Sequence, residues 1–236
     1  VLEQITARSN TLVTRGGQLE TQIRYTRFGH DSFGRMAWRA LPGDSPTSPT
    51  QTYRYDLADP VSRVVERSRT RRGGPLDAER VQCFDGKGRQ TQTRVKAAEG
   101  TWLVKDHAEF GSDDAPVRAY QTHTSDTGAC ATTAPAGVRS ITTERDAMGR
   151  TVREVMDDAE TFGTPSQRRV TFAPLVTYRY DEEDTDPTSP RYDTPEVEWT
   201  DGLGRPVRTR RWLDPDTTTD VSLTHDELGR DRGYVL

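Results

Sequence analysis

Polar and β-favouring residues alternate over short stretches of this chain, as they do in β-strands with one solvent-exposed face. The pattern is clearest at residues 89–95, 151–155 and 206–212, where Val, Thr and Trp are interspersed with Arg and Gln. No stretch keeps a sustained 3.6-residue apolar period, so we expect little helix. The pattern predicts an all-β fold made of half-buried, mostly antiparallel strands.

A repeated turn sequence, Asp-x-x-Gly-Arg, separates these strands and occurs five times, at 31–35, 85–89, 146–150, 201–205 and 226–230. An Asp side chain at the start of a turn can accept a hydrogen bond from the backbone two residues on. Gly supplies the positive φ of a tight reversal, and we expect the Arg to bind turn carboxylates or neighbouring strands. The predicted turn residues are Asp31, Gly34, Arg35, Asp85, Gly88, Arg89, Asp146, Gly149, Arg150, Asp201, Gly204, Arg205, Asp226, Gly229 and Arg230.

Weaker turn signals fall between the five strong ones. Asp56, Asp106, Asp126 and Asp181 divide the gaps into steps of about 20 to 30 residues, which is enough for a strand pair and its turn. The longer step from Asp146 to Asp181 predicts an insertion, which we place at residues 162–167.

The elements expected along the chain follow from these turns and from Pro and Gly positions. We expect two or three strands in 1–41 with reversals at Asn10 and Gly16-Gly17, a hairpin at 51–70, paired strands in 79–110, a hairpin at 138–156, one long strand at 168–181 and a hairpin at 196–213. Between them we expect a loop at 44–49, a connection at 71–75, at most a turn at 78–81, loops at 112–116 and 126–137, and an excursion from the sheet at 184–195. The loop at 126–137 is expected to be mobile.

The composition is poor in core-forming residues for a globule of this size. Hydrophobic residues make up 31% of the 236, charged residues 30%, and the net charge is −4. A single-layer sheet needs few fully buried residues and would account for this. The sequence has no strongly basic region of the kind that binds nucleic acid. It also has no run of 18 apolar residues, the length expected of a membrane-spanning helix. The chain opens on a strand-like stretch and stops just after a turn, so we expect residues 1–236 to be one repeat segment of a larger protein.

Residues capable of chemistry have a structural explanation in each case. Cys83 and Cys130 allow one bridge, although we expect a small apolar strand residue and a loop thiol. The four histidines, His30, His107, His123 and His225, match no metal motif. The acidic run 181–186 is expected to be a solvated loop rather than a cation site. We therefore predict no catalytic, cofactor-binding or metal-binding residue.

The repeated turn resembles a known family. With Tyr55-Asp56 and Tyr180-Asp181, it is similar to the tyrosine–aspartate (YD) or Rhs repeat of bacterial polymorphic toxins, insecticidal toxin complexes and animal teneurins. Residues 81–89 and 198–205 look most like toxin-complex B subunits. His, Phe, Arg or Thr precedes the other turn aspartates, which favours this degenerate form over the most regular arrays.

The resemblance implies a strip of a hollow β-shell that encloses a toxin polypeptide, in a protein secreted by a bacterium or held on its surface. Its partners would be the rest of the shell and the cargo, with no nucleic acid, cofactor or membrane span. No Asp-Pro pair here is followed by Gly-Leu, so the aspartyl self-cleavage motif of cargo-releasing shells is absent at Asp59-Pro60, Asp186-Pro187 and Asp214-Pro215.

Two other readings remain open. A cell-surface adhesion or carbohydrate-binding module would present aromatic side chains in a groove, and an enzyme acting on polysaccharides would do so with catalytic groups. The candidate aromatic residues are Trp38, Trp102, Trp199 and Trp212, which we expect to pack between layers instead.

Overall fold

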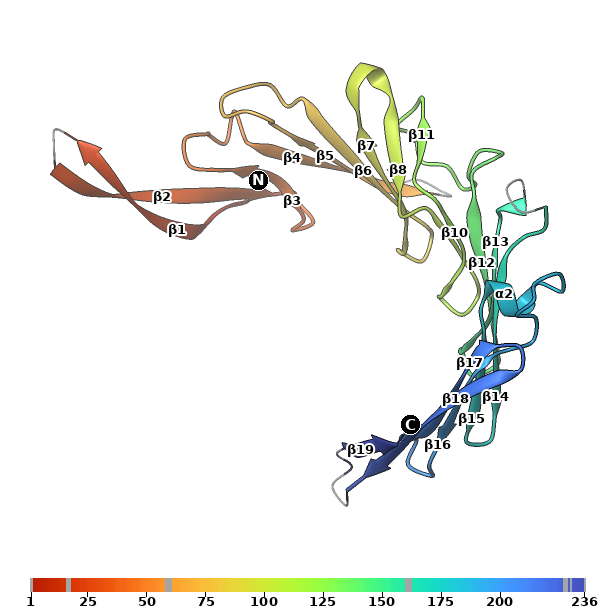
Figure 1. The fold of residues 1–236 in the computed structure, drawn as a ribbon. Coiled ribbons are helices and arrows are strands. Elements are labelled where there is room, and N and C mark those ends of the chain that lie inside the picture. The colour runs from red at the N-terminus through yellow and green to blue at the C-terminus, as the bar shows by residue number, and fades with distance from the viewer. Residues whose placement is uncertain are drawn as a thin grey trace. The chain divides into compact units, whose positions relative to one another are not determined.

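The computed structural model describes residues 2–15, 18–57, 61–159, 163–226, 229 and 231–235. Almost all regular structure in these residues is antiparallel β-strand, arranged in two open sheets (Figure 1). The predicted all-β class is confirmed. The chain divides into two compact units, Val1–His107 with Gln121–Ala136, and Ala108–Tyr120 with Gly137–Leu236.

The first unit is a nine-stranded sheet in the order β1-β2-β3-β4-β5-β6-β7-β8-β11. Its strands are β1 (Leu2–Arg15), β2 (Gln18–His30), β3 (Met36–Ala40), β4 (Gln51–Asp56), β5 (Ser62–Ser68), β6 (Ala78–Phe84), β7 (Gln90–Lys96), β8 (Trp102–Lys105) and β11 (His123–Ser125), with a 3₁₀ turn η1 (Ala98–Gly100).

The second unit is a ten-stranded sheet in the order β19-β18-β17-β16-β15-β14-β13-β12-β10-β9. Its elements are β9 (Ala108–Phe110), β10 (Pro116–Tyr120), β12 (Ser140–Arg145), β13 (Thr151–Met156), β14 (Gln167–Ala173), β15 (Val176–Tyr180), α2 (Glu182–Thr185), β16 (Glu196–Thr200), β17 (Pro206–Asp214), β18 (Thr217–His225) and β19 (Asp231–Val235). No helix in the described part of the chain is long and apolar enough to cross a bilayer.

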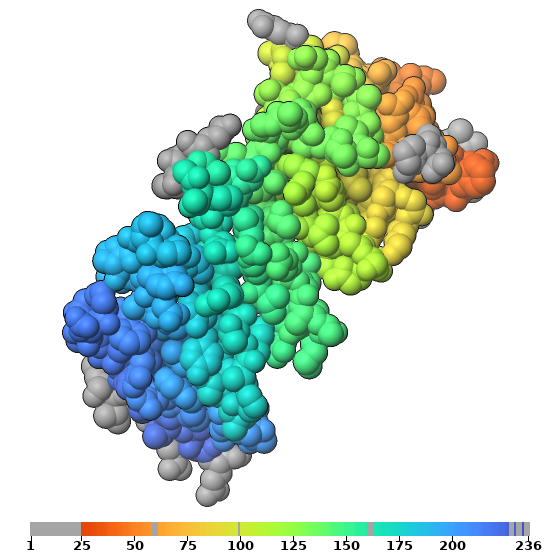
Figure 2. All heavy atoms as spheres, turned by 90° about the vertical axis from the view of Figure 1, so that its right-hand side faces the viewer, coloured from red at the N-terminus to blue at the C-terminus, as the bar shows by residue number. Residues whose placement is uncertain are grey.

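Each sheet is essentially one layer thick, because the described strands contact only their neighbours in the same sheet. The buried apolar cluster is correspondingly small. It consists of Val65, Val81, Cys83 and Trp102 on one face of the first sheet. The loop 126–136 covers this face through Cys130 and Gly128. In Figure 2, green atoms from the middle of the chain border the yellow and orange atoms of the first unit. The low hydrophobic content is thus sufficient for the fold.

Several predicted elements differ from the structure. Asn10 lies inside β1, since that strand continues from Leu2 to Arg15, and residues 78–81 begin strand β6. The expected strand 168–181 is two strands, β14 and β15, joined at Pro174-Leu175. Proline fixes φ at the first central turn position, and Leu175 takes φ +59° at the second.

The long step between Asp146 and Asp181 is therefore explained by the extra β14–β15 hairpin, and not by an insertion at 162–167 alone. The other predicted hairpins and loops are found where expected. Gly16-Gly17, Asp59-Pro60, Phe162 and Arg230 lie outside the described residues.

Candidate functional site

The repeat turns are closed by hydrogen bonds among their own five residues. In the 201–205 copy, the Asp201 amide donates to the Arg205 carbonyl at 2.9 Å, and the Gly204 amide donates to the Asp201 carbonyl at 2.9 Å. The Asp201 Oδ1 atom accepts from the amides of Leu203 at 2.9 Å and Arg205 at 3.0 Å. One carboxylate oxygen therefore fixes the backbone path of the whole turn.

The second carboxylate oxygen holds the arginine. Nε of Arg205 donates to Oδ2 of Asp201 at 2.7 Å, and Nη2 lies 2.6 Å from the same oxygen. The same contacts occur in the copies beginning at Asp31, Asp85 and Asp146, with Nε–Oδ2 distances of 2.7–2.8 Å. In the fifth copy, the Gly229 amide donates to the Asp226 carbonyl at 2.9 Å.

The positive φ predicted for the motif glycines is found at all five positions, with values from +77° to +80°. A register shift also recurs at each of these hairpins, always immediately before the turn aspartate. The shift is the mark of a β-bulge, which adds one residue to one strand and increases the local twist. Each copy thus sets both the reversal and the local pairing geometry of its hairpin.

Two motif arginines make a second contact that the sequence analysis missed. The Arg35 guanidinium lies 4.3 Å from the ring centre of Tyr55, on the next strand β4. The Arg150 guanidinium lies 4.0 Å from the ring centre of Phe172, also one strand further on. Stacked guanidinium–aromatic pairs are attractive, so these arginines join a turn to its neighbouring hairpin. The sequence signal for this contact is an aromatic residue near the end of the strand that follows the hairpin, which is β4 for Arg35 and β14 for Arg150.

The arginine contacts favour the charged form of the turn aspartates. Hydrogen bonds from the Arg205 amide and then from its guanidinium lower the pKa of Asp201 from 3.8 to about 2. The Arg150 side chain likewise lowers the pKa of Asp146. At Asp31 and Asp85, partial desolvation raises the pKa, but the bonds from Arg35 and Arg89 outweigh it and the net shift is downward.

We expect the free energy of unfolding to fall as the pH drops from about 4 to about 2. A carboxyl group whose pKa is lower in the folded state stabilises that state above its unfolded pKa and loses this effect as the pH falls through the folded pKa. For Asp201 the window is 3.8 to about 2. Urea unfolding at several pH values should show a flatter dependence for Asp201→Asn than for the wild type. The control Asp216→Asn, in a turn outside the motif, should keep the wild-type slope, and equal slopes in all three proteins would contradict the assignment.

The Tyr-Asp pairs have other partners. Asp56 binds Arg54 on its own strand and Arg63 across the β4–β5 hairpin, both at 2.8 Å, and residues 58–60 of that turn lie outside the described part of the chain. Asp181 begins α2, where its side chain accepts from the amides of Glu183 and Asp184. Asp181 therefore keeps a role at a strand end without the five-residue closure.

A disulfide corrects the expectation for the two cysteines. Cys83 on β6 is bonded to Cys130 in the loop 126–136, with the two Cα atoms 5.8 Å apart. The loop is also held by Gln92, whose side-chain amide donates to the Ala131 carbonyl, and by the Trp102 ring, which packs against Gly128. The loop predicted to be mobile is thus fastened to the sheet, because it supplies the apolar cover that the strand face lacks.

Arg94 lies beneath the same loop and is only 3% exposed. Its guanidinium donates to the Gln92 side chain at 2.7 Å, the Ser125 hydroxyl at 3.0 Å and the Thr127 carbonyl at 2.8 Å. Burial lowers the pKa of Arg94. The buried cation is satisfied by neutral acceptors, two of them in β11 and the loop, so it orders that segment.

The histidines and the acidic run form no cation site in the described residues, where no group of three or more His, Cys, Asp or Glu side chains converges. The rings of His107 and His123 do meet, with centres 5.7 Å apart. In the acidic run, Asp181 and Asp184 make a capping box, and Asp184 is 7% exposed. The prediction of a solvated loop is wrong at Asp184. Its carboxylate accepts a hydrogen bond from the Thr194 hydroxyl at 2.7 Å, and this bond holds the excursion that follows in place.

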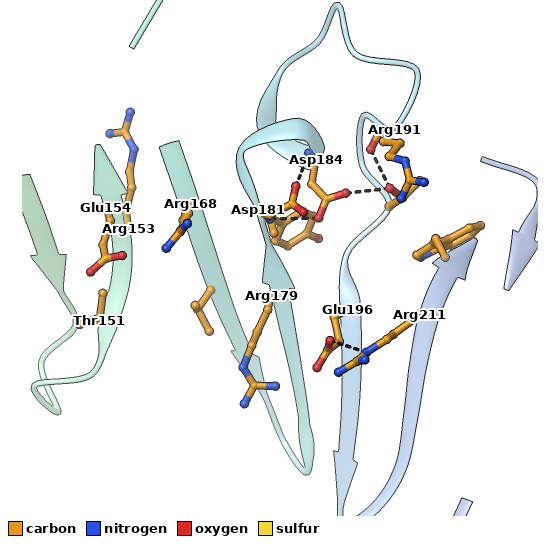
Figure 3. A pocket seen from close by; sticks show the side chains of 14 residues that line it. Thr151, Arg153, Glu154, Arg168, Arg179, Asp181, Asp184, Arg191, Glu196 and Arg211 are labelled. Carbon is orange, nitrogen blue, oxygen red and sulfur yellow. Dashed lines mark hydrogen bonds and ion pairs between the residues drawn. The ribbon is translucent and has the colours of Figure 1, made fainter. Parts of the chain in front are cut away.

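Charged side chains surround a cavity of about 400 Å³ in the second unit (Figure 3). Arg179, Glu196 and Arg211 project into it from β15, β16 and β17, and Arg211 donates to Glu196 at 2.8 Å. The walls are completed by Arg153, Glu154, Arg168, Asp181, Asp184 and Arg191, with Trp212 at one side. Positive and negative groups nearly balance, and Val170, Tyr180 and Trp212 add apolar area to the lining.

The tryptophans do not pack between layers, because the sheets have no second layer. Trp38 lies over Gly29 on the paired strand β2, where a Cβ atom would come within 2.1 Å of its ring. Trp199 is stacked with Arg208, whose guanidinium is 4.7 Å from the ring centre. Both rings therefore cover their own sheet, as Trp102 does beneath its loop.

No protein-family model matches the chain, and no curated protein matches its sequence. Solved structures do match. A chain of the TcdB2-TccC3 crystal structure superposes with a TM-score of 0.71 at 17% identity, over 96% of this chain and 14% of its own length. A chain of TcdB2-TccC3-TEV gives 0.74 at 14% identity, over 96% and 17%.

A chain of the Photorhabdus luminescens Tc holotoxin pore, with a substitution in TccC3, gives a TM-score of 0.59 at 18% identity. It covers 74% of this chain and 10% of its own length. The present chain thus spans a small part, at most 17%, of each of these three proteins. The chain shares the fold of these Tc toxin chains.

Proposed function

We propose that this chain is a wall segment of an Rhs-repeat shell that encloses a toxin polypeptide and helps to deliver it. The observation that carries the proposal is the shared fold, which extends over 96% of the chain in TcdB2-TccC3. The partners would be the remaining repeats of the shell and the enclosed polypeptide. The protein would be secreted by a bacterium or held on its surface.

The chemistry of the sheets suits a container. A polypeptide kept unfolded must meet a surface that offers it little apolar area to bury, since burial of apolar area drives collapse. The described faces carry cross-strand charged pairs such as Arg179–Glu198, at 3.4 Å, and Arg211–Glu196, at 2.8 Å. Such pairs fill the hydrogen-bonding capacity of the wall within the wall itself.

The proposed role is non-catalytic. The repeat aspartates are engaged in turns. Of the carboxylates around the cavity, Glu196 pairs with Arg211, and Asp184 is held by the Thr194 hydroxyl and the Asp181 amide. We therefore propose that substitutions here alter delivery only where they alter folding.

Protease protection in the full-length gene product tests the proposal. Its enclosed polypeptide should resist digestion under conditions that degrade the same polypeptide expressed alone. The double variant Gly149→Val and Gly204→Val should abolish this resistance, because a β-branched residue is strained at φ +77° to +79°. The control Gly202→Val alters the same turn at a position without positive φ and should stay protected.

Digestion of the wild-type cargo at the rate of the free polypeptide would exclude a shell. A glycan array with the present chain examines the adhesion alternative in parallel. Saturable glycan binding by the wild type, together with unprotected cargo, would favour adhesion over encapsulation.

A further inference from the structure

The third residue of the repeat turn is apolar and almost fully exposed. Phe33, Met148 and Leu203 occupy this position in three copies and are 81%, 77% and 79% exposed. The fifth copy also has an apolar residue there in the sequence, Leu228, outside the described part of the chain. Only the copy at 85–89 has a polar residue, Lys87.

These side chains gather on one edge of each sheet. Successive antiparallel strands place alternate turns at the same edge, and the β14–β15 and β16–β17 turns lie side by side in Figure 1. The intervening turns on the same edges carry Leu57, 78% exposed, in the first unit and Leu175, 55% exposed, in the second. Phe33, Leu57, Met148 and Leu203 are the four most exposed large hydrophobic residues among those described.

The turn itself does not require an apolar residue at this position. The Lys87 amide donates to Asp85 at 2.9 Å, the same distance as the Leu203 amide to Asp201. The hydrogen bonds that close the turn are thus the same with a polar side chain at this position. Phe33 makes a further local contact, its ring centre lying 5.0 Å from the Arg35 guanidinium. A row of exposed apolar side chains along one edge is a candidate interaction surface.

The partner can be characterised from charge and spacing. The Asp and Arg of the four described tips pair with each other, and Lys87 is the one further charged residue at the third position of these turns, so the edge carries no row of positive charge for an anionic surface. Tips on the same edge are two strands apart, about 9.6 Å from the strand spacing. A second array of the same hairpins has this spacing, whereas a lipid surface has no matching period.

We propose that the edge formed by these turns is a docking surface for a second copy of this chain, with the row of turns of one copy in contact with the row of turns of the other. The inference goes beyond the proposed function, because it involves no cargo and would hold for any assembly built from the repeat.

Sedimentation velocity of the purified chain tests this proposal. The variants exchange residues that already occur at the third position of the repeat turn. The tip-lysine variant, Phe33→Lys with Met148→Lys and Leu203→Lys, copies the residue found at Lys87. It should self-associate at least tenfold more weakly than the wild type. The reciprocal variant Lys87→Leu should associate more strongly. The three added lysines bring the net charge from −4 towards zero, which alone would favour association, so a weakening reports the lost apolar tips.

The open strand edges are the same in all three proteins and contribute equally to any background association. Far-UV circular dichroism and melting curves should coincide, since the turn already accepts lysine. Wild-type association in the tip-lysine variant, or no change in Lys87→Leu, would overturn the proposal. Flotation with phosphatidylcholine vesicles is the last arm. Vesicle binding by the wild type that disappears in the tip-lysine variant would assign the edge to lipid and also overturn it.

Discussion

Replacing both cysteines, Cys83→Ala with Cys130→Ala, is expected to lower the free energy of unfolding of the first unit by about 4 kcal/mol. The bridge closes a segment of 47 residues, and chain-entropy estimates for a loop of this length give about 4 kcal/mol. The loop 126–136 would also leave the face of Val65, Val81 and Trp102 more often, exposing an apolar cluster against which, besides Cys130, only Val61 packs among the described partly buried hydrophobic residues. Hydrogen exchange of the β6, β7 and β8 amides during urea unfolding measures the loss.

The second unit provides the internal control in the same protein. Amides of β14 to β17 should exchange at wild-type rates, because neither cysteine lies in that unit. Reduction of the wild type with a thiol should reproduce the loss seen in the variant. Unchanged exchange in β6–β8 after either treatment would show that the loop is held without the bridge.

The substitution Gly204→Ala is expected to destabilise its hairpin by about 1 kcal/mol or more. Gly204 has φ +77°, a conformation that L-residues rarely adopt, yet a Cβ atom built there would meet nothing within 4 Å. The cost therefore arises from the backbone alone. Hydrogen exchange of the β16 and β17 amides, or the urea midpoint of the second unit, measures this loss of stability.

The matched control is Gly202→Ala, two residues earlier in the same turn. A Cβ atom there also meets nothing within 4 Å, and Gly202 has no positive φ. Restricting the unfolded chain should make this substitution neutral or stabilising by about 0.4–1 kcal/mol. Equal effects at the two glycines would mean that backbone conformation is not what the repeat conserves.

The turns were predictable because their bonding is local. The Asp carboxylate, the Gly φ and the Arg side chain act within five residues, so the sequence contains every partner. The all-β class followed from the same repetition. The split of 168–181 was also local, but Pro174-Leu175 lacks the glycine that marks the five repeat turns, and Leu175 takes a φ that its residue type does not favour.

The cover of the first sheet was not predictable, because it depends on segments far apart in the chain. Cys83 and Cys130 are separated by parts of both units, and Arg94 finds two of its three acceptors more than 30 residues away. A loop rich in small polar residues gives no sign that it will pack on a strand face. Asp184 was misjudged for a similar reason, since its burial depends on the excursion folding back to place Thr194 beside it.

The interleaving of the two units constrains the order in which the chain can complete itself during synthesis. Strands β9 and β10 of the second unit are made before β11 and the loop 126–136 of the first. On the ribosome, the face formed by Val65, Val81 and Trp102 therefore stays uncovered until residue 136 has emerged. By then β9 and β10 have been synthesised, whereas their partner strand β12 has not. A nascent chain stalled before residue 126 should accordingly offer chaperones an apolar surface that one stalled after residue 136 no longer presents.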